Sequence, residues 1–119
     1  MSDIRLKRAY DVPAANDGYR VLVDGMWPRG VAKADAGIDL WLKALAPSAD
    51  LRKWFGHDPE KWDTFQSRYQ EELASGEQAR AFQRLRGLYD RGRVTLVFAA
   101  RNRKFNNAVV LKQRLRAAE

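Results

Sequence analysis

The stretch Val94-Thr-Leu-Val-Phe-Ala-Ala100 decides the fold class, because it is a nearly unbroken apolar run between two polar segments. A run of this kind is typical of a central strand that is buried on both faces of a parallel sheet. It is preceded by a helical pattern in which Phe82, Leu85 and Tyr89 recur until Gly92. This alternation of helix and strand predicts an α/β domain.

Two strands are predicted near the N-terminus. Residues 4–7 alternate between apolar and polar, and residues 19–23 form a β-rich run that Asp24-Gly25 closes. The loop between them is short for a parallel crossover, so we expect the first strand to be antiparallel to the second or at an edge. Residues 38–43 alternate again and predict a third strand. The result is a mostly parallel (mixed) sheet of about four strands flanked by helices.

Capping residues indicate where three further helices begin. Ser48 is the predicted N-cap of a short helix. Asp58, followed by proline, begins a longer helix that we expect to end at Ser75-Gly76. Asn106 or Asn107 is the predicted cap of the last helix. The sequence contains no linker or repeat, so we expect residues 1–119 to form a single domain.

Composition excludes several classes of protein. The chain has 119 residues and 45% hydrophobic residues, enough for a core. It contains no apolar run of the ~18–20 residues that a membrane span needs, and its first residues lack the apolar segment of a signal peptide. We therefore expect a cytoplasmic protein with no membrane partner. Nothing in the sequence indicates an oligomeric state.

Residue types and motifs also restrict the chemistry. The chain has no cysteine and one histidine, His57, which excludes thiolate metal sites and sites with two histidine ligands. No glycine-rich phosphate loop or nucleophile elbow is present. We therefore expect neither a metal nor a cofactor.

The positive charge is concentrated in the last third of the chain. The net charge is +7, and residues 77–119 alone contain eleven Lys or Arg and three Asp or Glu. Fifteen of the 22 cations are arginine, which binds phosphate and carboxylate groups in a bidentate manner. This favours an anionic partner, although a solvated basic surface gives the same pattern.

Two loops contain charged, amide and aromatic side chains that a turn alone does not require. Residues 24–30 follow the second predicted strand, and residues 99–107 follow the central one. Ligands of open α/β sheets bind outside the carboxyl ends of the strands. If these two strands are parallel neighbours, Arg29 and Arg101 meet at the same edge of the sheet.

Eight residues are candidates for a binding site at this edge. Arg29 and Arg101 would neutralise an anion, two tryptophans would flank it, and an aspartate and an asparagine would orient it. The full candidate set is Asp24, Trp27, Arg29, Trp54, His57, Asp58, Arg101 and Asn106. Each has an ordinary structural interpretation as well. Trp27 could cap the core, Arg29 could pair with Asp24, and Asn106 could be a plain helix cap.

Long runs of this chain resemble a known family. They are IRLKRAYD (4–11), DGYRVLVDGMWPRGV (17–31), DLWLKALAPSADLRKWFGHDPEKW (39–62) and TLVFAARNRKFNNAVVL (95–111). They look like the YeaO-like branch of DUF488, an uncharacterised family. The resemblance implies a small cytoplasmic, chiefly bacterial α/β domain and supplies no reaction. Its signature positions map onto Arg8, Asp11, Asp24, Trp27, Pro28, Arg29, Trp54, Phe55, His57, Asp58, Arg101 and Asn106.

Departures from the family pattern bear on catalysis. The resemblance implies an arginine where this chain has Gly25, and an aspartate and a histidine where it has Asn102 and Phe105. If that aspartate and histidine are a catalytic pair, this chain has lost both. A binding role resting on Arg29 and Arg101 would survive the change.

The sequence therefore supports one leading hypothesis and two alternatives. The leading one is a domain that binds a small anionic ligand at the strand ends. The first alternative is sequence-independent binding of nucleic acid by the basic last third, with these residues: Arg80, Arg84, Arg91, Arg101, Arg103, Lys104, Lys112 and Arg116. The second is a metal-independent enzyme that uses His57 or Asp58.

Overall fold

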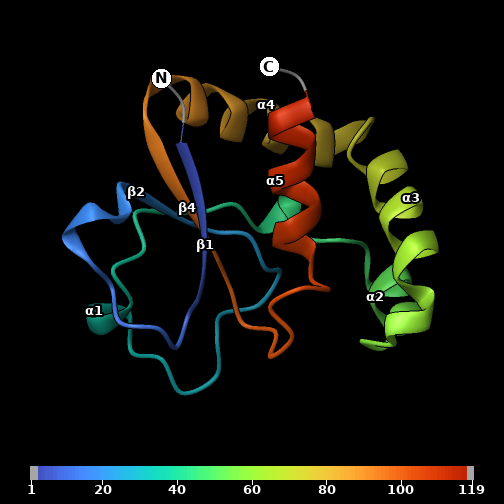
Figure 1. Ribbon diagram of the computed structural model, residues 1–119, viewed down its shortest axis with the longest axis horizontal. Helices are drawn as coiled ribbons and strands as arrows, with labels where there is room; N and C mark the ends of the chain where they lie inside the picture. The colour runs from blue at the N-terminus through green and yellow to red at the C-terminus, as the bar shows by residue number, and fades with distance from the viewer. Residues whose placement is uncertain (1–2, 118–119) are drawn as a thin grey trace.

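Four parallel strands form the sheet at the centre of the molecule, in the spatial order β1-β4-β2-β3 (Figure 1). The computed structural model describes residues 3–117. The strands are β1 (Asp3–Arg8), β2 (Tyr19–Leu22), β3 (Leu40–Trp41) and β4 (Arg93–Phe98). The prediction of an α/β domain with a sheet of about four strands is confirmed, and so is the central position of β4.

The directions and lengths of the strands differ from the prediction in two respects. The sheet is entirely parallel instead of mixed. β1 lies at an edge, as one alternative had it, but it is not antiparallel to β2. The short loop allows this because β4 lies between β1 and β2, so the loop does not join neighbouring strands. β3 has two residues instead of six, because the chain turns into a 3₁₀ turn at Lys43–Leu45.

Five helices complete the fold: α1 (Lys33–Ala36), α2 (Ala49–Phe55), α3 (Trp62–Glu72), α4 (Gly76–Arg91) and α5 (Asn107–Ala117). Besides the 3₁₀ turn at Lys43–Leu45, further short 3₁₀ turns lie at Ala15–Asp17 and Pro59–Lys61. Within residues 3–117, no helix is both long enough and apolar enough to cross a membrane.

Most helix boundaries follow the predicted caps. The Ser48 hydroxyl accepts a hydrogen bond from the Leu51 N–H at the start of α2, and Asp58 caps the 3₁₀ turn before α3. The expected end of α3 at Ser75-Gly76 is wrong. These residues begin α4, since α3 has already ended at Glu72 and the chain needs only a short turn between the two helices.

The two faces of the sheet are covered differently. One face packs against α2–α5 and forms the main core, in which Val21, Leu96 and Phe98 are fully buried. The other face carries the polar Arg20 and Thr95 and the buried apolar Leu22 and Val97, and it is covered by the loops around α1 and Ala15–Asp17. Side chains alternate along each strand, so the core face and this second face come from successive residues.

A buried ionic network holds the second face together. The Arg20 guanidinium donates to the Asp17 carboxylate at 2.6 Å and to the backbone oxygens of Ala36 and Gly37, each at 3.0 Å. Lys7 reaches the same carboxylate at 3.1 Å. Since Arg20 is only 4% exposed, each donor that is satisfied here replaces a bond to water. The network ties α1 to the sheet.

Candidate functional site

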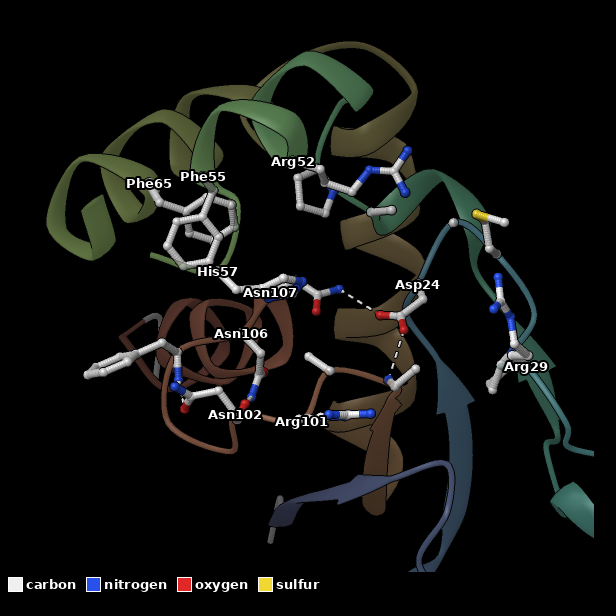
Figure 2. Close-up of a pocket in the computed structure, with 18 of the residues that line it drawn as sticks. Asp24, Arg29, Arg52, Phe55, His57, Phe65, Arg101, Asn102, Asn106 and Asn107 are labelled. Atoms are coloured by element: carbon white, nitrogen blue, oxygen red, sulfur yellow. Dashed lines mark hydrogen bonds between the residues drawn. The ribbon is translucent and has the colours of Figure 1, made fainter. Parts of the chain in front are cut away.

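A cavity of about 720 Å³ opens at the carboxyl ends of β2 and β4, between the 24–30 loop, α2 and the 99–107 loop (Figure 2). β2 and β4 are parallel neighbours, so the two loops that follow them emerge side by side. The structure thereby brings Arg29 and Arg101 to one cavity. This is the position that ligands take in open α/β sheets.

Asp24 lies at the inner end of the cavity and connects three elements. One carboxylate oxygen accepts a hydrogen bond from the Ala99 N–H at 2.9 Å, and the other accepts one from the Asn107 side-chain amide at 3.1 Å. Its backbone oxygen accepts a bond from the Trp41 indole at 2.7 Å. Burial raises the pKa of Asp24 above its usual value, and the two donors and nearby Arg52 partly offset this. Asp24 makes no ion pair with Arg29, so that structural interpretation of the loop is wrong.

Three arginines from separate segments line the cavity: Arg29, Arg52 and Arg101. Within residues 3–117, none of these side chains forms an ion pair or a hydrogen bond with another group. A polar surface with spare donors therefore faces the cavity, where Figure 2 shows Arg29 and Arg52 on different sides of Asp24. The phenol of Tyr10 donates to the Arg29 backbone oxygen at 2.9 Å and fixes the loop.

Arg52 is the residue that the sequence analysis missed. It comes from α2 and approaches the backbone of Gly25. A Cβ atom at Gly25 would lie 3.4 Å from the Arg52 guanidinium nitrogen. The Arg52 guanidinium therefore lies within van der Waals reach of position 25, next to Asp24. The one sequence feature that could have pointed to Arg52 is Gly25, which directly follows Asp24 at the end of the strand. Nothing in the sequence, however, indicates that Gly25 contacts a helical residue 27 positions later.

The 99–107 loop is held by contacts with the last residue of β1 and with the loop that follows β1. The Arg8 side chain donates to the backbone oxygens of Ala100 and Ala99, at 2.9 and 3.1 Å. Arg103 makes a bidentate ion pair with Asp11, with both bonds at 2.8 Å. The Arg103 guanidinium lowers the pKa of Asp11 to about 2. These contacts fix the loop that carries Arg101.

The asparagines in this loop differ in what they offer to a ligand. Asn106 is 3% exposed and caps α5 by accepting from the Val109 N–H. Its amide nitrogen donates to the Asn102 backbone oxygen, so the side chain is occupied by the loop itself. Asn107 instead directs its amide nitrogen at Asp24 and at the Val23 backbone oxygen. The sequence predicts only a role as helix cap for Asn107.

Aromatic side chains form the wall of the cavity opposite Arg29 (Figure 2). The rings of Phe55 and Phe65 stack at 4.2 Å, and Phe105 also lines the cavity. His57 is at the wall in a left-handed backbone conformation, with φ of 58°. That conformation is uncommon for residues other than glycine. Trp27 lines the cavity as expected, and its indole donates to the Val31 backbone oxygen at 2.7 Å.

Two candidate residues are not brought to the cavity. Trp54 is absent from its lining, and the Arg68 guanidinium lies 4.5 Å from the centre of the Trp54 ring. Asp58 is also absent from the lining, and its carboxylate accepts a bond from the Glu60 N–H at 3.0 Å. The sequence makes Trp54 a candidate because it lies at the end of an element and could wall a pocket, and Asp58 because it is the capping acid beside His57. Trp54 instead packs against α3, and Asp58 caps the turn that leads to α3.

The basic residues of the last third come from α4, β4, the 99–107 loop and α5. Arg91 precedes β4 and Arg101 follows it, so they lie at opposite ends of a central strand. Arg103 is neutralised by Asp11. Within the described residues, no group of three His, Asp or Glu side chains could hold a metal ion.

Comparison with known proteins identifies relatives across nearly the whole chain. The family model described as the inactive DUF488-N3 subclade matches residues 3–119. An uncharacterised protein of Mycobacterium tuberculosis is 45% identical over 112 residues, which are 94% of this chain and 92% of that protein. The uncharacterised protein YeaO of Escherichia coli is 41% identical over 115 residues, 97% of this chain and 98% of YeaO. No solved structure matches significantly.

Proposed function

The chain belongs to the DUF488 family, in the subclade described as inactive DUF488-N3, and from this premise we propose that it is a binding domain for a small anionic molecule. The ligand would occupy the cavity at the ends of β2 and β4. The single observation that carries the proposal is the convergence of Arg29, Arg52 and Arg101 on one cavity.

Three guanidinium groups line this one concave surface, and all three side chains are exposed to solvent. Like charges repel, and the effect is stronger beside a cavity wall than in open water. A bound phosphate or carboxylate would relieve this repulsion through charge-assisted hydrogen bonds. Asp24 is the one carboxylate in the lining, so the cavity keeps an excess of positive charge.

The size and lining of the cavity also suit a small molecule. Its volume of about 720 Å³ lies within the range of ~300–1,000 Å³ that is usual for ligand sites. Its walls combine apolar and aromatic side chains with Asp24 and the three arginines. A surface for a large polymer would be flatter and longer.

Binding is a better proposal than catalysis for this chain. A general base needs a partner that orients it, and within residues 3–117 the His57 side chain has no hydrogen-bond partner. Asp58 points its carboxylate at the Glu60 N–H instead. The description of the subclade as inactive, and the replacement of the expected aspartate and histidine by Asn102 and Phe105, support the same choice.

A thermal-shift panel of inorganic anions, nucleotides, sugar phosphates and short RNA and DNA tests the proposal. A ligand at a hundred times its Kd adds about 2.7 kcal/mol to the free energy of unfolding, a shift of several degrees for a domain of this size. A small anion that shifts the Tm then goes to calorimetry with the variants Arg29→Ala and Arg101→Ala. Each variant should weaken binding by about 1.5–3 kcal/mol, because a hydrogen bond to a charged group is lost.

Arg84→Ala is the matched control, because it removes one exposed arginine from α4, outside the cavity lining. It should leave the affinity unchanged. Equal affinity in the wild type and in both cavity variants would reject this placement of the site. A panel in which only polymers shift the Tm would reject the small ligand.

A further inference from the structure

We propose that the ligand of this cavity is not a simple oxyanion but a planar nitrogen heterocycle that carries an anionic substituent and presents N–H donors, as in a purine nucleoside monophosphate. The inference rests on the proposed function, because it assigns a chemical class to the same site. It follows from the arrangement of Asp24 and Asn107 relative to the three arginines.

The inner end of the cavity offers hydrogen-bond acceptors. The Asp24 carboxylate uses two of about four acceptor positions for Ala99 and Asn107, which leaves the other two for a ligand. The Asn107 amide nitrogen faces two acceptors, Val23 O and Asp24, so its orientation is fixed. Its oxygen, which bonds to nothing among residues 3–117, is then a further acceptor at the same place.

The arginines offer the opposite chemistry. A guanidinium has donors and no acceptor. Within the described part of the chain, the side chains of Arg29, Arg52 and Arg101 donate no hydrogen bond, although Arg52 lies close enough to Asp24 to lower its pKa. Asp24 lies among them (Figure 2). A ligand that is only an anion would gain from the arginines but would be repelled by the carboxylate. A ligand with N–H groups beside its anionic group would satisfy both sets.

The side chains that line the cavity walls also restrict the shape of the ligand. Phe55 and Phe65 are 5% and 2% exposed and stack on each other. The aromatic rings in the lining that are at least partly exposed include those of Trp27, His57 and Phe105. A flat ring packs on such a wall, whereas an aliphatic amino acid would leave most of a 720 Å³ cavity unfilled. The guanine edge places two N–H donors next to each other, which matches the two free acceptor positions of a carboxylate.

The experiment compares three probes by calorimetry: guanosine 5′-monophosphate, inosine 5′-monophosphate and sulfate. Inosine monophosphate has the same phosphate but lacks the exocyclic amino group. In the wild type it should bind about tenfold more weakly than guanosine monophosphate, because one hydrogen bond to a charged acceptor is lost. Sulfate should bind more weakly than either.

Asp24→Asn should then affect the probes in opposite directions. It removes the negative charge, so sulfate should bind several-fold more tightly. It also replaces one acceptor by a donor, so guanosine monophosphate should bind about tenfold more weakly. Asp90→Asn, which removes one exposed carboxylate next to the end of α4, should change neither affinity. If Asp24→Asn does not fold, the wild-type ratio of the two nucleotides still decides the question.

The outcomes separate this inference from the proposed function. Equal binding of the two nucleotides in the wild type, or a parallel response of sulfate and guanosine monophosphate to Asp24→Asn, would overturn the inference. The binding domain would stand in that case, provided that Arg29→Ala and Arg101→Ala weaken both probes. If these arginine variants have no effect on any probe, the proposed function itself fails.

Discussion

The carboxylate of Asp24, at the end of β2, accepts a hydrogen bond of 2.9 Å from the backbone N–H of Ala99, at the end of β4. This bond continues the pairing of the two strands beyond the sheet, where the ladder itself has ended at Leu22 and Val97. It also holds a carboxylate at the inner end of a cavity lined by three arginines. The Asp24 side chain thus links the ends of β2 and β4 and lies at the inner end of the cavity.

The Ala99 amide should report the ionisation of Asp24. Its NMR shift should titrate with a midpoint above the ordinary aspartate pKa of about 3.9, because burial raises the pKa of Asp24. A carboxyl group whose pKa is higher in the folded state than in the unfolded state lowers the free energy of unfolding once it is ionised in both states. The free energy of unfolding should therefore fall as the pH rises from about 4 through the raised pKa. A midpoint below 3.9, or an unchanged titration of Ala99 in Asp24→Asn, would contradict this.

The ion pair between Asp11 and Arg103 should change stability with pH in the opposite direction. The pKa of Asp11 is lowered to about 2, so its contribution is present above about pH 4 and is lost as the pH falls through about 2. Arg103→Ala should return the pKa of Asp11 toward 3.9. It should cost little stability, because the Arg103 side chain is 57% exposed and water screens a surface ion pair. Carbon-detected NMR titration measures the pKa, and Lys104→Ala is the neighbouring control.

Arg20→Ala should be strongly destabilising. It leaves the buried Asp17 carboxylate with Lys7 as its one cationic partner and removes the bonds to Ala36 and Gly37. Breaking a buried ion pair in this way costs roughly 3–5 kcal/mol. Urea unfolding at neutral pH measures the change, and Arg84→Ala should stay within about 0.5 kcal/mol of the wild type. A loss below about 1 kcal/mol would show that the network does not hold α1 to the sheet.

Two glycines with similar positive φ angles should respond differently to substitution by alanine. Gly18 and Gly30 have φ of 70° and 79°, which strains any residue with a Cβ atom by roughly 1–3 kcal/mol. At Gly18 the new Cβ would also lie 2.4 Å from the Arg93 backbone oxygen, whereas at Gly30 nothing lies within 4 Å. Gly18→Ala should therefore be the more destabilising in thermal unfolding. Equal Tm values for the two variants would show that the close contact at Gly18 relaxes without cost.

Nucleic acid should bind weakly and with a modest dependence on salt. Arg91 and Arg101 lie at opposite ends of β4, and Arg103 already pairs with Asp11, so we expect these three residues not to contact one phosphate backbone together. Each phosphate contact on duplex DNA contributes a log–log slope of about −0.9. Fluorescence anisotropy from 50 to 200 mM salt should give a slope shallower than about −4. A steeper slope that Arg80→Ala and Arg84→Ala reduce would favour the polymer instead.

Local patterns in the sequence determined most of the elements. The apolar run at 94–100 identified the central strand, and Ser48, Asp58 and the Phe82–Tyr89 spacing located helices, because capping and periodicity involve residues within a few positions of each other. The same patterns placed both loops at strand ends. They did not give the direction of β1, since that depends on which strand lies beside it.

Only the tertiary structure decided the composition of the site. The parallel pairing of β2 with β4 joined Asp24 to Ala99 and brought Arg29 and Arg101 to one cavity. The packing of α2 added Arg52, whereas Trp54 and Asp58 were left outside. A side chain's neighbours in the sequence do not determine which face of an element it occupies or which distant segment packs against it. Those choices follow from burying one common core, so they exist only once the whole chain has folded.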